Sequence, residues 1–225
     1  MERYTFLGVI VVTLLALAIA LMIPGQPKEQ PVDLPWQIER LANGNTRVFG
    51  LELGNSTLSD MQDKLQEEPE VSLFVSEEGR HVVEAFFQRV NLSGLRARMV
   101  VGMDLTEQEI KEMYNRGARI ATLGSGTRKV TLSTDDNVKL MNTPIATITY
   151  LPKADLDQEL VERRFGKPTQ RVREQDGPVE HWLYPEKGLD IALSDEEKDV
   201  LQYTLPARFE ALVAPLLEAS SVKMH

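Results

Sequence analysis

An apolar run from Phe6 to Ile23 constrains this chain more than any other feature of its sequence. The run is 18 residues long, contains no charged side chain, and has Leu, Ile, Val or Phe at 12 positions. As a helix it would be ~27 Å long, close to the ~30 Å hydrocarbon core of a bilayer. The run predicts a transmembrane anchor over residues 6–23, with residues 1–5 as a cytoplasmic tail.

A cleaved secretory signal is the alternative interpretation of the same run. Arg3 supplies a positive charge before it, and Ala18 and Ala20 have the small-x-small spacing of a cleavage site. The apolar residues continue past that site to Ile23, which favours an uncleaved signal-anchor, and the absence of cysteine excludes a lipoprotein. Both interpretations export the rest of the chain. We expect a single-pass inner (plasma) membrane protein whose C-terminal domain is periplasmic.

The charge balance limits the classes of partner. Without residues 1–35 the chain has 23 basic and 31 acidic side chains, a formal charge of −8. Such an acidic body lacks the electrostatic footprint of a nucleic-acid-binding protein, so no nucleic acid is expected as a partner. The absence of cysteine excludes disulfides and thiolate chemistry.

Proline content and hydrophobic patterning divide the rest of the chain. Residues 24–35 contain four prolines and read as a semi-rigid linker. Beyond it, cap signals and apolar spacing predict helices at Leu58–Leu65, from Thr106 to Arg116, from Ser133 to Met141, at Leu156–Phe165, and after Pro206. Alternation predicts strands at Thr46–Leu53, Val71–Val75, Val82–Val90, Leu95–Met103, Arg128–Leu132, Ile145–Leu151, Val179–Tyr184, Leu189–Leu193 and Val200–Thr204.

A short helix followed by an antiparallel meander occurs twice in this list. The segment Val83–Phe87 matches Val179–Leu183, and Gly94-Leu95 matches Gly188-Leu189. The sequence therefore predicts an α+β protein with an N-terminal transmembrane helix and two helix-and-antiparallel-meander units, residues 36–143 and 144–225, which share a core or a continuous sheet.

The second unit resembles a known family. Its helix ends in Phe165-Gly166-Lys167-Pro168, and His181–Tyr184 and a strand led by Gly188 follow it. Over roughly Asp155–Thr204 this pattern is similar to the SmpA/OmlA (BamE-like) barrel-assembly lipoproteins. The whole chain also resembles an uncharacterised family of bacterial envelope proteins with a single N-terminal span. The resemblance implies fold and compartment, and a scaffold role by analogy.

Chemistry-bearing residues do not form a recognisable catalytic or metal-binding motif. None of His81, His181 and His225 has a second ligand at a spacing typical of metal sites. His181 alternates with Trp182 and is interpreted as an exposed or rim residue. Gly124-Ser125-Gly126 precedes a strand and is interpreted as a flexible turn. We therefore expect no enzyme activity, no catalytic or metal-binding residue and no cofactor.

Six residues form the candidate interaction surface: Phe86, Arg96, Arg98, Trp182, Tyr184 and Tyr203. The aromatic members are of the types enriched at interface hot spots, although packing of Trp182 and Tyr184 under the helices is the alternative. Arg96 and Arg98 share a strand face that is either solvated or binds an anion. We expect a non-catalytic scaffold or adaptor that binds another envelope protein; the alternative is a module binding a small molecule or cell-wall fragment between its two units.

Overall fold

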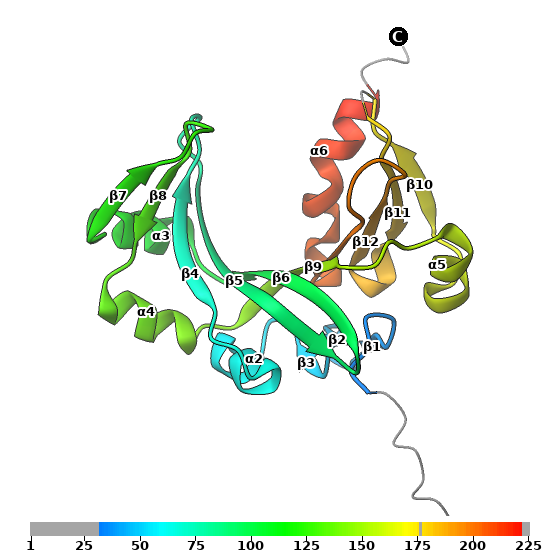
Figure 1. Cartoon of the computed structure of the whole chain (residues 1–225), viewed down its shortest axis with the longest axis horizontal. Coiled ribbons are helices and arrows are strands. Elements are labelled where there is room, and N and C mark those ends of the chain that lie inside the picture. Colours follow the sequence, from blue (N-terminus) through cyan, green and yellow to red (C-terminus); the bar gives the residue numbers. More distant parts are fainter. Residues whose placement is uncertain (1–31, 176, 222–225) are drawn as a thin grey trace, which may run out of the picture. The chain divides into compact units, whose positions relative to one another are not determined.

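The computed structural model describes residues 32–175 and 177–221, and its main element is a ten-stranded antiparallel sheet (Figure 1). The strand order is β10-β11-β12-β13-β9-β6-β5-β4-β8-β7. The strands are β4 (Glu70–Val75), β5 (His81–Leu92), β6 (Leu95–Met103), β7 (Arg119–Thr122), β8 (Arg128–Thr131), β9 (Ile145–Pro152), β10 (Gln170–Arg173), β11 (Glu180–Tyr184), β12 (Leu189–Leu193) and β13 (Val200–Thr204). A separate three-stranded sheet contains β1 (Glu39–Arg40), β2 (Thr46–Val48) and β3 (Leu51–Glu52).

Within the described ranges, five short α-helices begin at side-chain caps or after a proline turn. They are α2 (Leu58–Leu65), α3 (Glu107–Asn115), α4 (Thr134–Met141), α5 (Gln158–Phe165) and α6 (Phe209–Ser221), with short 3₁₀ turns at Pro185–Lys187 and Pro206–Arg208. The predicted capping box of α3 is confirmed: Thr106 Oγ1 accepts from the Glu109 N–H, and the Glu109 carboxylate accepts from the Thr106 N–H. Helix α5 begins later than the sequence indicates, because Asp157 caps it.

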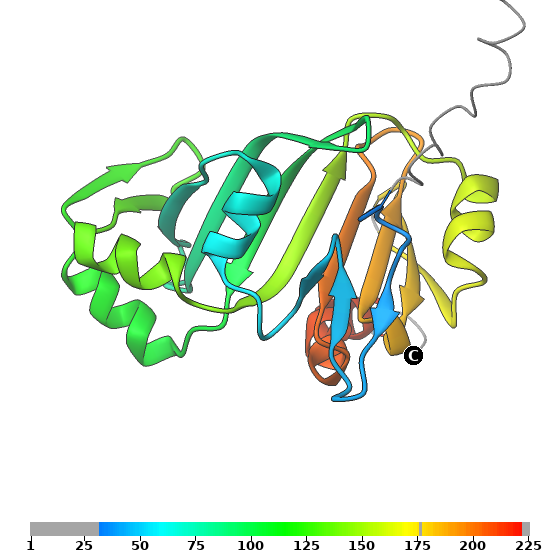
Figure 2. The same cartoon turned by 90° about the horizontal axis from the view of Figure 1, so that it is seen from below.

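The main core lies on one face of the ten-stranded sheet. Helices α2, α3, α4 and α5 and the three-stranded sheet all cover this face (Figure 2). Phe49, at the turn between β2 and β3, stacks on Tyr150 of β9 and meets Tyr203 of β13 edge-on. Helix α6 covers the opposite face over β10–β12, where Phe209 and Val213 pack on Val172 and Leu183 (Figure 1).

The predicted fold class is wrong: the described residues form mainly one ten-stranded antiparallel sheet and a three-stranded sheet, with short helices and no helix that could span a membrane. A helix followed by three antiparallel strands does occur twice, as α2–β4–β5–β6 and α5–β10–β11–β12, but both sets belong to one sheet. Strand β9 joins them because it pairs with β6 on one side and with β13 on the other; Tyr150 lies opposite Met99 and Leu201. Two separate units would leave the backbone groups of β9 without a partner along one edge.

The described residues contain no helix that corresponds to the predicted membrane anchor. The longest helix among residues 32–175 and 177–221 is α6, whose 13 residues extend about 20 Å. No helix in these ranges is long and apolar enough to span a bilayer. Within these ranges the predicted single-pass topology, inner-membrane location and membrane partner therefore have no spanning helix to support them. The predicted span itself, Phe6–Ile23, and most of the predicted linker lie outside the described residues.

The outermost strands of the sheet are short and polar. Within the described ranges, β10 and β7 each pair on one side only. Each has four residues, and every residue of β7 is exposed. Arg119 lies on β7, and Arg171 and Arg173 lie on β10. Neither strand was predicted from the sequence, because each is only four residues long and has at most two apolar residues.

Candidate functional site

Three of the four aromatic residues in the expected interaction surface belong to the core. Trp182 and Tyr203 are completely buried, and Tyr184 is nearly so. Trp182 and Tyr184 share a face as the alternation indicates, but this is the face that α5 covers. The Tyr184 hydroxyl donates to the Gly166 carbonyl oxygen at 2.8 Å, and the Tyr203 hydroxyl donates to the Pro35 carbonyl oxygen at 3.0 Å. These side chains stabilise the fold and are not available as exposed anchors.

The other three residues of that expected surface are accessible on the opposite sheet face. Arg96 and Arg98 are exposed on β6, and Phe86 is half-buried on β5, opposite Val100. No helix among the described residues covers this part of the sheet (Figure 1). The structure therefore separates the predicted surface into a buried aromatic set and an exposed set near the end of β6.

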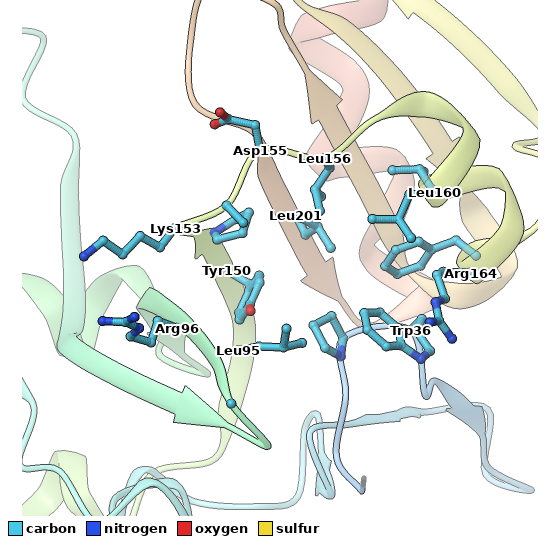
Figure 3. Close-up of a pocket in the computed structure, with 16 residues that line it drawn as sticks. Trp36, Leu95, Arg96, Tyr150, Lys153, Asp155, Leu156, Leu160, Arg164 and Leu201 are labelled. Carbon is cyan, nitrogen blue, oxygen red and sulfur yellow. The ribbon is translucent and has the colours of Figure 1, made fainter.

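The most ligand-like cavity lies between α5 and the sheet, and we call it the α5 pocket (Figure 3). Its volume is about 530 Å³. Helix α5, strands β6, β9 and β13, and the segment at Trp36 supply its walls. The apolar lining residues are Pro35, Trp36, Leu95, Tyr150, Pro152, Ala154, Leu156, Leu160, Val161, Phe165 and Leu201.

The charged lining residues of the α5 pocket are the cations Arg96, Lys153 and Arg164 and the carboxylate Asp155, and they lie at its rim. Figure 3 shows Arg96 and Lys153 at one end, pointing away from the apolar walls, with Arg164 at the other. The Arg164 guanidinium lies 4.6 Å from the centre of the Trp36 ring, which holds both side chains in place. Burial raises the pKa of Tyr150 to about 12, so its phenol is neutral in the wall. The pocket therefore combines an apolar interior with a mostly cationic rim.

A second cluster of polar groups lies beneath α6. His181 Nδ1 is 2.8 Å from Asp190 Oδ2, and His181 Nε2 is 3.2 Å from Glu174 Oε1. The His181 side chain is 14% exposed and lines a depression, so of the two expected placements, exposed or at a rim, the structure agrees with the second. The second oxygen of Asp190, Oδ1, is buried without a hydrogen-bond partner in the described structure. Sequence spacing did not reveal this cluster because a neighbouring strand and the segment after β10 supply the carboxylates.

The cluster lacks the remaining parts of a catalytic or metal site. No group of three metal-ligating side chains with suitable geometry occurs in the described part of the chain. The depression above His181, about 480 Å³, is lined by no Ser, Thr, Tyr or Lys side chain from the described residues. A hydroxyl or amine nucleophile that the histidine could activate is therefore absent from these described residues. We interpret the cluster as a structural ion pair.

The ion pair makes stability depend on pH. Burial acts to lower the pKa of His181, but the hydrogen bonds and charges of Asp190 and Glu174 outweigh it, so the pKa is raised above 6.5. Since the raised value belongs to the folded state, the stabilisation is complete below about pH 6.5 and is lost as pH rises through the folded pKa. We expect His181→Asn to remove this loss between about pH 6 and pH 8 in urea unfolding. His81→Asn is the control, and an unchanged pH profile in His181→Asn would contradict the ion pair.

Comparisons with protein-family models, curated proteins and solved structures find no match for this chain. The resemblance to the barrel-assembly lipoproteins therefore stays a prediction.

Proposed function

We propose that this protein is a non-catalytic binding module that takes a small, largely apolar ligand into the α5 pocket. The observation that carries the proposal is the pocket's combination of size and lining: about 530 Å³, apolar walls, and charges only at the rim. Pockets of roughly 300–1,000 Å³ with mainly apolar walls are typical of small-molecule sites. Leu95 comes from residues 36–143 and Leu160 from residues 144–225, so the ligand would lie between the two parts that the sequence distinguishes.

The buried aromatic residues favour this function over that of a protein adaptor. The centres of protein interfaces are enriched in aromatic anchors that are exposed before binding. Trp182, Tyr184 and Tyr203 are all in the core, which leaves Phe86 alone from that set on an accessible face. A concave apolar pocket therefore supports ligand binding better than the remaining surface supports protein docking.

A neutral fluorescent probe tests the proposal. We expect N-phenyl-1-naphthylamine, whose emission rises in apolar surroundings, to bind the full-length protein saturably. Leu160→Lys places a charge in the pocket and should weaken binding at least tenfold, because burying an unpaired ammonium is unfavourable. Leu160 is half-buried, so its replacement leaves the main core in place.

The matched control is Leu212→Lys, which replaces a half-buried leucine on α6. Leu212 lines the depression above His181 and lies outside the α5 pocket. Circular dichroism verifies that both variants are folded. Equal probe affinity in the two variants, or no saturable binding by the unmodified protein, would overturn the proposed function.

A further inference from the structure

A basic depression of about 670 Å³ adjoins the α5 pocket and shares Arg96, Pro152 and Lys153 with it. We call it the basic depression. No acidic side chain is among its described lining residues. Its five cationic lining residues are Arg89, Arg96, Arg98, Lys153 and Lys198. This concentration of positive charge stands out in a chain whose formal net charge is −9.

Three of these cations have no partner in the described structure. The side chains of Arg96, Arg98 and Lys153 make no ion pair or hydrogen bond within residues 32–175 and 177–221. Lys198, by contrast, lies 2.6 Å from Asp155. Arg89 lies 3.8 Å from Glu67 and is 86% exposed, so that pair is weak. Unpaired like charges repel one another, and an anion bound among them would reduce that repulsion.

The sheet itself brings these cations to one place. Arg96 and Arg98 alternate with buried residues on β6, so their side chains lie on the same face. Lys153 follows β9, and its backbone N–H donates to the Arg96 carbonyl oxygen at 2.9 Å. Figure 3 shows the Arg96 and Lys153 side chains pointing the same way, out of the apolar part of the pocket. The pairing of β6 with the end of β9 therefore places these three cationic residues next to one another.

We propose that the ligand of the α5 pocket is an amphipathic anion whose carboxylate or phosphate group binds in the basic depression. This inference rests on the proposed function, because the apolar part of the ligand occupies the α5 pocket. Arginine binds both kinds of oxyanion through paired N–H donors, and lysine adds a compact positive charge. The adjoining apolar pocket favours a molecule with one charged end over a polyanion, whose charges would have no counterpart among the apolar walls.

Four ligands that each carry a ten-carbon chain test the inference by calorimetric titration of the full-length protein. They are decanoate, decyl phosphate, 1-decanol and decyltrimethylammonium, each below its aggregation concentration. We expect at least one anion to bind about tenfold or more tightly than 1-decanol, and the cation to bind most weakly. Raising the ionic strength from about 0.01 M to about 1 M shortens the electrostatic screening length from about 30 Å to about 3 Å. The preference for the anion should therefore disappear at the higher ionic strength.

The diagnostic variant is Arg98→Gln, because Arg98 lines the basic depression but not the α5 pocket. We expect it to weaken anion binding several-fold and to leave 1-decanol binding unchanged. Arg80→Gln is the matched control, since Arg80 is 80% exposed in the turn between β4 and β5. The ratio of decanoate to decyl phosphate affinity identifies which head group the depression prefers.

The outcomes separate this inference from the proposed function. Equal affinity for the anions and 1-decanol, or unchanged anion affinity in Arg98→Gln, would overturn the proposal that the ligand is an anion. The proposal that the α5 pocket binds an apolar ligand would remain. Failure of both 1-decanol and the naphthylamine probe to bind overturns the proposed function itself. An anion preference that disappears at high ionic strength and falls in Arg98→Gln supports the inference.

Discussion

Replacing Trp182 by alanine is expected to lower the free energy of unfolding by about 3 to 5 kcal/mol. The Trp182 side chain is completely buried on β11. Its indole Nε1 donates to Glu180 Oε2 at 2.8 Å, and the Arg171 guanidinium lies 3.8 Å from the centre of its ring. The substitution therefore removes a large buried side chain and leaves a cavity. A domain is typically stable by only about 5 to 15 kcal/mol, so this loss is a large part of the total.

Urea unfolding followed by circular dichroism measures the effect, with Phe86→Ala as the control. Phe86 is half-buried on the open face of the sheet, so we expect its replacement to lower the free energy of unfolding by only about 1 kcal/mol. An exposed anchor at position 182 would predict little loss of stability. Equal effects of the two substitutions would contradict the burial of Trp182.

Gly188→Ala is expected to have a comparable effect of roughly 2 to 5 kcal/mol, for a different reason. Gly188 has φ +62°, and a Cβ atom there would lie 2.1 Å from the Thr204 carbonyl oxygen. The left-handed conformation alone destabilises alanine by about 1 to 2 kcal/mol. Displacing backbone in a packed region adds about 1 to 3 kcal/mol. The Thr204 N–H also donates to the Gly188 carbonyl oxygen at 2.8 Å, so the two segments cannot separate without breaking that bond.

Gly79→Ala separates the two contributions to this effect. Gly79 has φ +80° in the turn between β4 and β5, but a Cβ atom there would meet nothing within 4 Å beyond its chain neighbours. We expect this variant to lose only the conformational part, about 1 to 2 kcal/mol. Thermal unfolding of both variants provides the measurement. A Gly188→Ala variant no less stable than Gly79→Ala would show that the close approach to Thr204 is absent in solution.

Helix caps and apolar alternation in the sequence predicted those helices and strands whose boundaries are set by neighbouring residues. Strands β6, β12 and β13 have the predicted bounds, and the Thr106 and Ser133 caps begin α3 and α4 as expected. The predicted strand Thr46–Leu53 is instead a hairpin, because Phe49 and Gly50 both adopt positive φ. Of these two residues only Gly50 is of a type that favours such a turn, so the sequence indicates the hairpin only weakly.

Features that depend on distant parts of the chain were not predictable in the same way. The pairing of β9 with both β6 and β13, which joins the two expected units, is a matter of register between distant segments. The same holds for the candidate sites. Asp190 of β12 contacts His181 of the neighbouring strand β11, and Trp36 contacts Arg164 of α5, which is far from it in the sequence. The alternation of Arg96 and Arg98 was visible in the sequence, but Lys153 and the apolar pocket beside them were not.

The two outer strands bear on how this molecule behaves in a crowded solution. A sheet edge with free N–H and C=O groups is a template on which another chain can add, and repeated addition produces cross-β fibres. Strands β7 and β10 offer only four residues each, and both carry arginine. Two copies approaching edge to edge bring like charges together. Short length and positive charge at both ends of the sheet therefore protect it against polymerisation.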